Sequence, residues 1–255
     1  METYNNEIVI IEHFQSLDTK SIILIPENAE SIVELVHDKN KWKAWKDSSG
    51  KSDPPPDFYS EKYKLMLDVM RIDDHAYISS KGQVVNPTLA CEGKLMKEFE
   101  RSNFAKMFPN VNVFFEVNTG LPTDQDHNYK YYIDNFKRVV ENHKRKIKQY
   151  RENHPGYKTI FFIFDESSAY FETDAVNLVI DKAYLGRPHQ WYLDEELVKV
   201  FENSDIDYVV WFAPFKLMKS EDQVIDLPRA AIFDTKAIDL DTIRYCLTKM
   251  KSNEL

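Results

Sequence analysis

The chain has 255 residues, of which 43% are hydrophobic and 13% aromatic, and its formal net charge at pH 7 is -9. This length and composition allow a sizeable core and fit one domain over residues 1–255. The acidic charge argues against wholesale binding of nucleic acids, which depends on clustered lysines and arginines, and no apolar run approaches the ~20 residues that span a bilayer.

The first part of the chain alternates between short apolar strands and amphipathic helices. Residues 22–25 form an apolar run, and apolar residues at helical spacing predict a helix over 29–46. After the proline-rich segment 54–56, the residues from 63 to 70 alternate in polarity, which predicts a strand. Asp68 points away from the apolar face of this strand, among methionines, and is therefore a candidate functional residue.

The alternation continues through the rest of the chain. A hairpin is predicted around residues 80–82, and Pro87 opens a helix. Residues 111–117 alternate as a second strand that contains Glu116. The elements expected after it are a helix over 129–153, a strand over 159–167, a helix over 194–202, strands over 207–212 and 230–233, and a closing helix over 240–250. This order predicts an α/β fold with a mixed central sheet flanked by helices.

The strongest chemical signal is the pair of acids within apolar strands, Asp68 and Glu116. Ionised carboxylates are rarely buried unless they are paired or bind a cation. Magnesium takes oxygen ligands, and a bound cation can activate water against a phosphodiester, so both acids are candidate Mg²⁺ ligands. The alternative is that each carboxylate caps a neighbouring turn or pairs with Arg71 or a helix lysine.

The order of helix, strand with Asp68, strand with Glu116, long basic helix and apolar strand resembles the core of the PD-(D/E)xK nucleases. This group is the restriction endonuclease-like superfamily. The resemblance covers approximately residues 29–166 and leaves 167–255 as a C-terminal α/β extension. It implies that Asp68 and Glu116 together hold the metal ion.

One position departs from the pattern of that family. The lysine expected two residues after Glu116 is Asn118, and an amide does not carry the charge with which the lysine positions and activates the attacking water. Members of the family can supply this lysine from the following helix, and Lys130 stands near its start. The catalytic set that the resemblance implies is therefore Asp68, Glu116, Asn118 and Lys130.

Two other registers of the motif remain open. In one, Asp57 supplies the first acid and Asp68 begins the bipartite motif, with Met70 in the place of the lysine and Arg71 one position later. The other is the intact D-x-K at 234–236, which comes too late in the chain to be followed by the usual helix and strand. Its position favours an exposed strand end.

His75 follows Asp73 and Asp74 directly and is a further candidate metal ligand. Loop acids of this kind are usually solvated, which is the simpler interpretation. The chain contains neither a glycine-rich nucleotide loop nor a GxSxG sequence, so the sequence does not support a P-loop enzyme or a serine hydrolase.

The long helix carries the one basic cluster identified in the sequence. Its candidate nucleic-acid-binding residues are Lys137, Arg138, Lys144 and Arg145. The alternative interpretation of these residues is a solvated helix face, since alternating lysine, glutamate and asparagine on an amphipathic helix needs no partner.

Three functions follow from these observations. The first is a Mg²⁺-dependent DNA or RNA phosphodiesterase, for example of a restriction or other defence system. The second is an inactive nuclease-like protein that binds a partner protein as an immunity or regulatory module, which the acidic charge and the missing lysine favour. The third is an acidic domain of unrelated α/β topology. A homodimer is compatible with the first two.

The expected compartment is the cytoplasm. The two cysteines, Cys91 and Cys246, lie far apart and lack the spacing of a zinc site or a disulfide framework. The first residues lack the basic segment of a signal peptide.

Overall fold

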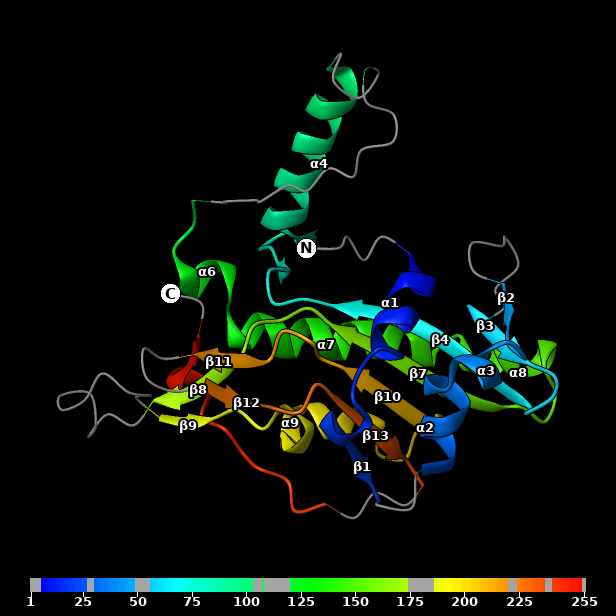
Figure 1. Ribbon diagram of the computed structural model, residues 1–255. Helices are drawn as coiled ribbons and strands as arrows, with labels where there is room; N and C mark the ends of the chain where they lie inside the picture. The colour runs from blue at the N-terminus through cyan, green and yellow to red at the C-terminus, as the bar shows by residue number, and fades with distance from the viewer. Residues whose placement is uncertain are drawn as a thin grey trace.

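A computed structural model describes residues 6–26, 30–48, 56–102, 107, 120–173, 186–219, 224–236 and 240–253. Its centre is a seven-stranded sheet in the order β1-β13-β10-β7-β4-β3-β2 (Figure 1). These strands are β1 (Ile22–Ile25), β13 (Ala230–Asp234), β10 (Tyr208–Phe212), β7 (Lys158–Asp165), β4 (Leu65–Ile72), β3 (Phe58–Ser60) and β2 (Lys46–Asp47). The expected mixed sheet flanked by helices is thereby confirmed.

The sheet has a parallel centre and antiparallel flanks. β7 runs parallel to β4 on one side and to β10 on the other, whereas β3 is antiparallel to β4 and β13 is antiparallel to β10. The carboxyl ends of β4, β7 and β10 therefore meet at one edge of the sheet. In open α/β sheets, ligands bind outside this edge.

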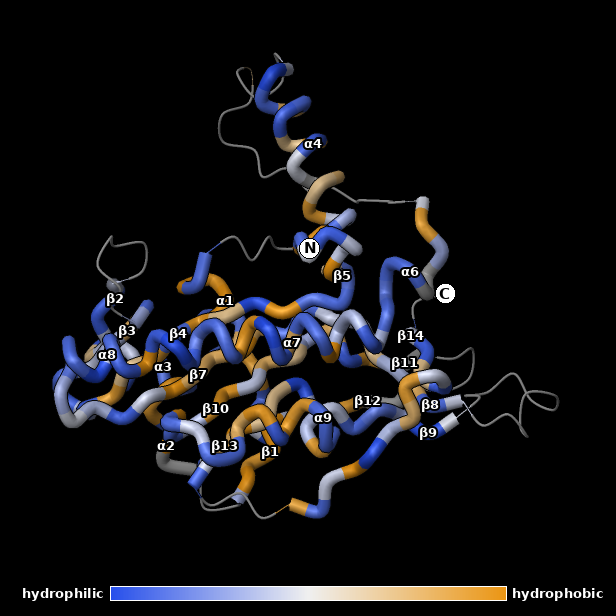
Figure 2. The backbone as a smooth tube through the Cα atoms, turned by 180° about the vertical axis from the view of Figure 1, so that it is seen from behind, coloured by the Kyte–Doolittle hydropathy of each residue, from blue (hydrophilic) through white to orange (hydrophobic). Residues whose placement is uncertain are grey.

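Helices cover both faces of the sheet. The main ones are α1 (Glu7–Phe14), α2 (Glu30–His37), α7 (Tyr129–Lys144) and α9 (Glu195–Val198). Phe161 of β7 packs toward Phe136 of α7, whereas the next residue, Phe162, packs toward Ile11 of α1. A central parallel strand is buried on both faces, so its sequence is a continuous apolar run. Along α7, hydrophobic and hydrophilic segments alternate (Figure 2), as expected for a helix with one buried face.

Shorter elements complete the described chain. The helices are α3 (Lys39–Trp42), α4 (Pro87–Arg101), α6 (Thr123–Asp126) and α8 (Ile147–Asn153), with 3₁₀ turns at Thr19–Ser21, Trp191–Leu193, Lys199–Phe201 and Leu247–Lys249. The remaining strands are β5 (Tyr77–Ile78), β6 (Val84–Val85), β8 (Tyr170–Thr173), β9 (Gly186–Pro188), β11 (Leu217–Lys219), β12 (Val224–Asp226) and β14 (Met250–Ser252). The predicted hairpin is formed by β5 and β6, and α4 projects from the body of the molecule above it (Figure 1).

Two predicted helices are each divided in the structure. The helix expected over 29–46 ends at His37, because Asp38 is extended and its carboxylate accepts the N–H of Asn40 (2.7 Å) to begin α3. The helix expected over 129–153 is interrupted between α7 and α8. The strand predicted over 111–117 lies outside the described residues.

The closing helix predicted over 240–250 is wrong. Ile243 instead donates its N–H to the carbonyl of Leu193 (2.7 Å) and accepts the N–H of Glu195 (3.0 Å). β14 then pairs with β8. Backbone pairing with distant segments therefore overrides the helical spacing of the apolar residues.

Within the described ranges, the helices are too short or too polar to cross a lipid bilayer.

Packing of α7 on the sheet yields a first prediction. Phe136 is fully buried, and its ring lies 4.6 Å from that of Trp211, centroid to centroid. Phe136→Ala should lower the free energy of unfolding by about 3–5 kcal/mol, because it removes a large buried ring and leaves a cavity. Urea unfolding measures the loss. Asn142→Ala, on the exposed side of α7, is the control and should change stability by less than about 0.5 kcal/mol. Equal midpoints for the two variants would contradict this packing.

Candidate metal centre

The carboxyl ends of β4 and β7 present a group of polar side chains at one edge of the sheet. Asp73, Asp74 and His75 follow β4 directly, and Ser167 and Ser168 follow Asp165, the last residue of β7. Because β4 and β7 are parallel neighbours, these two loops lie side by side. They form the framework of the candidate site.

Asp74 is the fixed centre of this group. It is fully buried, and its Oδ2 accepts hydrogen bonds from the Ser168 N–H (3.0 Å), the Ser168 hydroxyl (2.8 Å) and the Tyr170 hydroxyl (2.7 Å). Its other oxygen, Oδ1, lies 3.1 Å from His127 Nδ1 and 3.8 Å from His75 Nε2. One carboxylate oxygen therefore anchors the residue, and the other faces two imidazoles.

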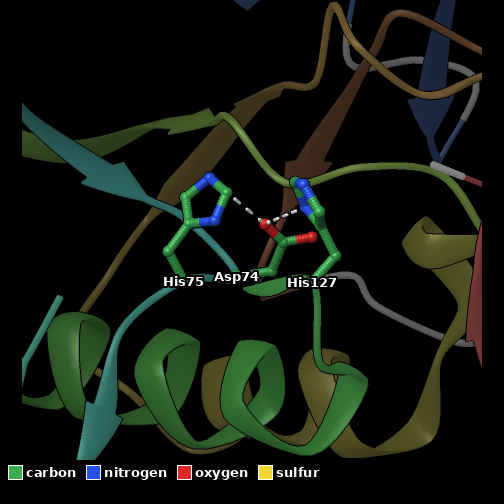
Figure 3. A group of neighbouring side chains, drawn as sticks. All are labelled: Asp74, His75 and His127. Atoms are coloured by element: carbon green, nitrogen blue, oxygen red, sulfur yellow. Dashed lines mark hydrogen bonds and ion pairs between the residues drawn. The ribbon is translucent and has the colours of Figure 1, made fainter. Parts of the chain in front are cut away.

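The two imidazoles lie on either side of the Asp74 carboxylate (Figure 3). His75 is oriented by Asp126, whose backbone carbonyl lies 2.9 Å from His75 Nδ1 and whose carboxylate lies 3.2 Å from it. This contact leaves His75 Nε2 directed toward Asp74. The carboxylate of Asp126 also accepts the hydroxyl of Thr88 (3.2 Å). Such outer contacts fix the rotamer and tautomer of ligating histidines at metal sites.

The electrostatics favour an ionised carboxylate at Asp74. Burial by itself would raise the pKa of Asp74, but the hydrogen bond from His127 and the charges of His127 and His75 outweigh this effect. The pKa of Asp74 is therefore held well below its ordinary value. A metal ion at this position would replace the charge of the imidazolium groups, because ligating imidazoles are neutral.

Among the described residues, Asp74, His75 and His127 form a group whose ligand atoms all lie within 4.8 Å of one another, close enough to hold one metal ion. Two imidazole nitrogens and one carboxylate oxygen fit a first-row transition ion such as Zn²⁺ or Mn²⁺. Magnesium prefers oxygen ligands alone. The residues present therefore fit a transition metal better than the expected Mg²⁺.

A buried ionic network supports the loop that holds Asp74. Lys216, which follows β10, donates to the Ser168 carbonyl (2.9 Å) and to the Ser167 hydroxyl. Asp165 lies 3.6 Å from the Lys216 ammonium and accepts the hydroxyl of Tyr132 (2.6 Å). Burial lowers the pKa of Lys216, although Asp165 and Asp74 oppose this effect. Through Lys216, the end of β10 therefore contacts the end of β7 and the loop after it, next to the candidate metal centre.

Asp68 does not belong to this group. It is buried on the face of β4 that packs against α7, with Oδ2 at 2.5 Å from His143 Nδ1 and Oδ1 accepting the hydroxyl of Tyr150 (3.1 Å). The expectation that only the opposite face of this strand is apolar is wrong, because β4 is buried on both faces. The carboxylate is thus already paired by side chains. The other two residues of the implied motif, Glu116 and Asn118, lie outside the described residues.

Lys130 is not near Asp68, contrary to the expectation that it replaces the missing lysine. Asp68 contacts His143, which stands thirteen residues after Lys130 on α7 (143 minus 130). At 1.5 Å per residue this separation is roughly 20 Å along the helix axis. Lys130 instead lies beside the candidate metal centre, three residues after His127, and pairs with Asp134 (2.5 Å).

In the second alignment of the nuclease motif the two acids are Asp57 and Asp68, and these residues lie close together in the structure. Asp57 precedes β3, and its Oδ2 accepts the N–H of Val69 (2.7 Å), the residue after Asp68. Burial, and then the charge of Asp68, raise the pKa of Asp57 to about 7. Arg71 does not join this pair, because its guanidinium forms an ion pair with Glu166 (2.7 Å).

The third register lies at the opposite edge of the sheet. Asp234 ends β13, which is antiparallel to β10, and Asp234 is paired with Tyr208 at the start of β10. Lys236 donates to the carbonyl of Ser204 (2.5 Å). This D-x-K is therefore a strand end, as its position in the chain indicated, and lies far from the metal centre.

Several cations of the basic helix are engaged within the chain. Lys137 pairs with Glu196, and Lys144 pairs with Glu141 (2.6 Å). The remaining two predicted nucleic-acid-binding residues are Arg138, which donates to Asn135, and Arg145, which is exposed. Of the four, Arg138 is the one that lies near the metal centre, because Asn135 also donates to the carbonyl of Asp73 (3.1 Å).

The sequence pointed to His75 and its neighbouring acids but not to His127. A signal was present, because the sequence Asp-His-x-Tyr occurs twice, at 74–77 and at 126–129. The fold brings these two segments together, with the rings of His75 and His127 4.7 Å apart. Their repetition was the one indication that they form a common site.

Comparison with protein-family models, with curated proteins and with solved structures gives no match.

The raised pKa of Asp57 yields a second prediction. A carboxyl whose folded-state pKa (about 7) exceeds its ordinary value (3.8) favours the protonated form. Its ionisation therefore costs stability as the pH rises from about 4 to about 7. Asp57→Asn keeps an acceptor for the Val69 N–H, so it should be more stable than wild type by a few kcal/mol at pH 8, at about 1.4 kcal/mol per pH unit between the two pKa values. The difference should vanish near pH 4.

The measurement is urea unfolding at pH 4, 6 and 8. Asp241→Asn, at an exposed position, is the matched control and should show no such pH dependence. A constant difference between Asp57→Asn and wild type across this range would disprove the proposed ionisation.

Proposed function

We propose that the protein is a metal-dependent phosphodiesterase that acts on nucleic acids, with its metal ion bound by Asp74, His75 and His127. The observation that carries this proposal is the group of one buried carboxylate and two imidazoles at the carboxyl ends of parallel strands. This is the edge of an α/β sheet at which ligands bind.

The donor set determines the chemistry. When bound by these two imidazoles and this carboxylate, a transition ion would supply Lewis-acid chemistry, lowering the pKa of a water molecule and polarising a phosphoryl oxygen. In hydrolysis the water oxygen forms a bond to phosphorus while the bond from phosphorus to the leaving ester oxygen breaks, and that oxygen takes up a proton. Asp74, oriented by Ser168 and Tyr170, and His75, oriented by Asp126, hold the ligands in place for this reaction.

The surroundings of the site favour an anionic substrate. Lys130 stands three residues after His127 in the sequence, and Arg138 donates to Asn135, whose side chain also donates to the Asp73 carbonyl (3.1 Å). The order of helices α2 and α3, strand β4 with Asp68, long helix α7 and apolar parallel strand β7 further supports a restriction endonuclease-like core.

The proposal differs from the expected nuclease in the place and kind of the metal. Asp68 is engaged by His143 and Tyr150, whereas Asp74 faces two imidazoles. We therefore assign the metal to Asp74 and expect Zn²⁺ or Mn²⁺ in preference to Mg²⁺. A cytoplasmic location agrees with the free cysteines Cys91 and Cys246.

Metal binding and cleavage test this function together. Calorimetry should detect one strong site for Zn²⁺ or Mn²⁺ in the wild type and a loss of at least about tenfold in affinity in His127→Gln, because one ligand is removed. Cleavage of single- and double-stranded DNA and RNA, followed with the same ions, should fall with it. His154→Gln is the control, because His154 lies just before the start of β7, at the opposite end of that strand.

Retention of metal affinity and cleavage in His127→Gln would refute the assigned site. A folded wild type that binds none of these ions would refute the function itself.

One observation favours the second candidate, a partner-binding module. Leu89 and Met96 of α4 are exposed (58% and 41%), and their spacing of seven residues places them on one face of the projecting helix. A second copy of the chain or another protein would cover this face.

Sedimentation of the wild type and of the Leu89→Ser/Met96→Ser double variant tests whether the protein is a homodimer through this face. If it is, the wild type sediments as a dimer and the double variant as a monomer. A wild-type monomer excludes it.

A further inference from the structure

A groove lies beside the candidate metal centre, between the β5–β6 hairpin and α7. Its volume is about 140 Å³, and its walls are formed by residues of the hairpin and of the first half of α7. The lining residues used below are Tyr77, Lys130, Tyr131, Asp134, Asn135 and Arg138. At this volume the groove is smaller than the ~300–1,000 Å³ clefts that enclose a whole drug-sized ligand. It therefore accommodates one unit of a larger molecule.

The walls of the groove combine flat aromatic surface with positive charge. Tyr77 and Tyr131 are partly exposed and stack on each other, with ring centroids 5.3 Å apart and planes inclined by 28°. The lining has two cations, Lys130 and Arg138, and one carboxylate, that of Asp134. Asp134 pairs with Lys130 (2.5 Å), whereas Arg138 donates to Asn135, so the groove has an excess of one positive charge. This local excess is opposite in sign to the net charge of the whole chain, which is -9. Aromatic rings stack on bases, and lysine and arginine contact phosphates.

Both walls continue directly into the segments that supply the metal ligands. Tyr77 follows His75 by two residues on one wall, and Tyr131 follows His127 by four residues on the other. Asn135 connects the two regions, because it donates to the Asp73 carbonyl and accepts a hydrogen bond from Arg138. A ligand in the groove therefore has one end close to the imidazoles.

We infer that this groove binds one nucleotide unit, with its base against Tyr77 and Tyr131 and a phosphate beside Arg138 and Lys130. The adjoining phosphodiester then lies toward Asp74, His75 and His127. The inference deepens the proposed function by naming the subsite that positions the substrate. Binding in the groove itself needs no metal ion, so the two claims can fail separately.

The test is calorimetric binding to the full chain in EDTA, with thymidine monophosphate, inorganic phosphate and a short oligothymidylate as probes. Thymidine monophosphate should bind roughly tenfold or more tightly than phosphate, because a stacked base adds affinity that phosphate lacks. Tyr131→Leu should abolish this difference in affinity, and Arg138→Gln should weaken the binding of both thymidine monophosphate and phosphate. Lys148→Gln, which removes an exposed lysine from α8, is the control and should bind as the wild type does.

Circular dichroism establishes that each variant is folded, and Tyr77→Leu replaces Tyr131→Leu if the latter is not. Tighter binding of the oligothymidylate than of the mononucleotide supports a polynucleotide as the source of the unit, and equal binding supports a free nucleotide. Equal affinity for phosphate and thymidine monophosphate, or unchanged binding in both tyrosine variants, overturns the inference.

Together with the cleavage assay described above, this experiment separates the nucleotide subsite from the proposed function. Nucleotide binding in EDTA without cleavage in any metal supports the groove and refutes the phosphodiesterase. Cleavage that depends on His127, with no nucleotide binding in EDTA, supports the phosphodiesterase and overturns the groove.

Discussion

The buried carboxylate of Asp74 is the constraint on which the site depends. A buried ionised side chain needs hydrogen bonds or an opposite charge as partners. Without them its burial lowers the stability of the fold by several kcal/mol, or the side chain changes its protonation state. Asp74 meets this requirement with partners from three separate segments: the loop after β7, β8 and the end of α6. These hydrogen bonds hold the segments together. Together with the contact of Asp126 with His75, they place two imidazoles next to one carboxylate oxygen.

The parallel centre of the sheet supplies the rest of the framework. Since β4, β7 and β10 end at the same edge, the residues that follow them are brought together without any long connection. Lys216 and Asp165 form a second buried ionic pair behind Ser167 and Ser168, and the rings of Tyr132 and Tyr170 lie over the Lys216 ammonium at 4.4 Å and 5.7 Å. Such a network is stable only when each member has partners, so it fixes the position of the loop that binds Asp74.

The fold was largely predictable from local patterns of polarity. The apolar run of β7 and the alternation of β4 gave the central strands, and alternation also placed Asp68 opposite Leu65, Leu67 and Val69. That this second face is also buried, against α7, follows from the fold and not from the alternation. The closing helix was predicted wrongly, because the backbone of Ile243 pairs with residues about fifty positions earlier in the chain. Local spacing carries no information about such a partner.

The site was predictable only in part. His75 and Asp74 were recognised as neighbours in the sequence, but the role of His127 arises from a contact across the fold. The nuclease resemblance directed attention to Asp68 and Lys130, which the length of α7 keeps apart. The second alignment of the nuclease motif already combined Asp57 with Asp68. The structure adds that burial next to Asp68 raises the pKa of Asp57.

X-ray absorption spectroscopy of the zinc-loaded protein shows which side chains hold the metal ion. If His75 and His127 are ligands, the coordination shell contains scattering from two imidazole rings, which a His75→Gln/His127→Gln double variant loses. A shell of oxygen ligands alone, unchanged in that double variant, would contradict this assignment and place the ion at carboxylates elsewhere in the chain.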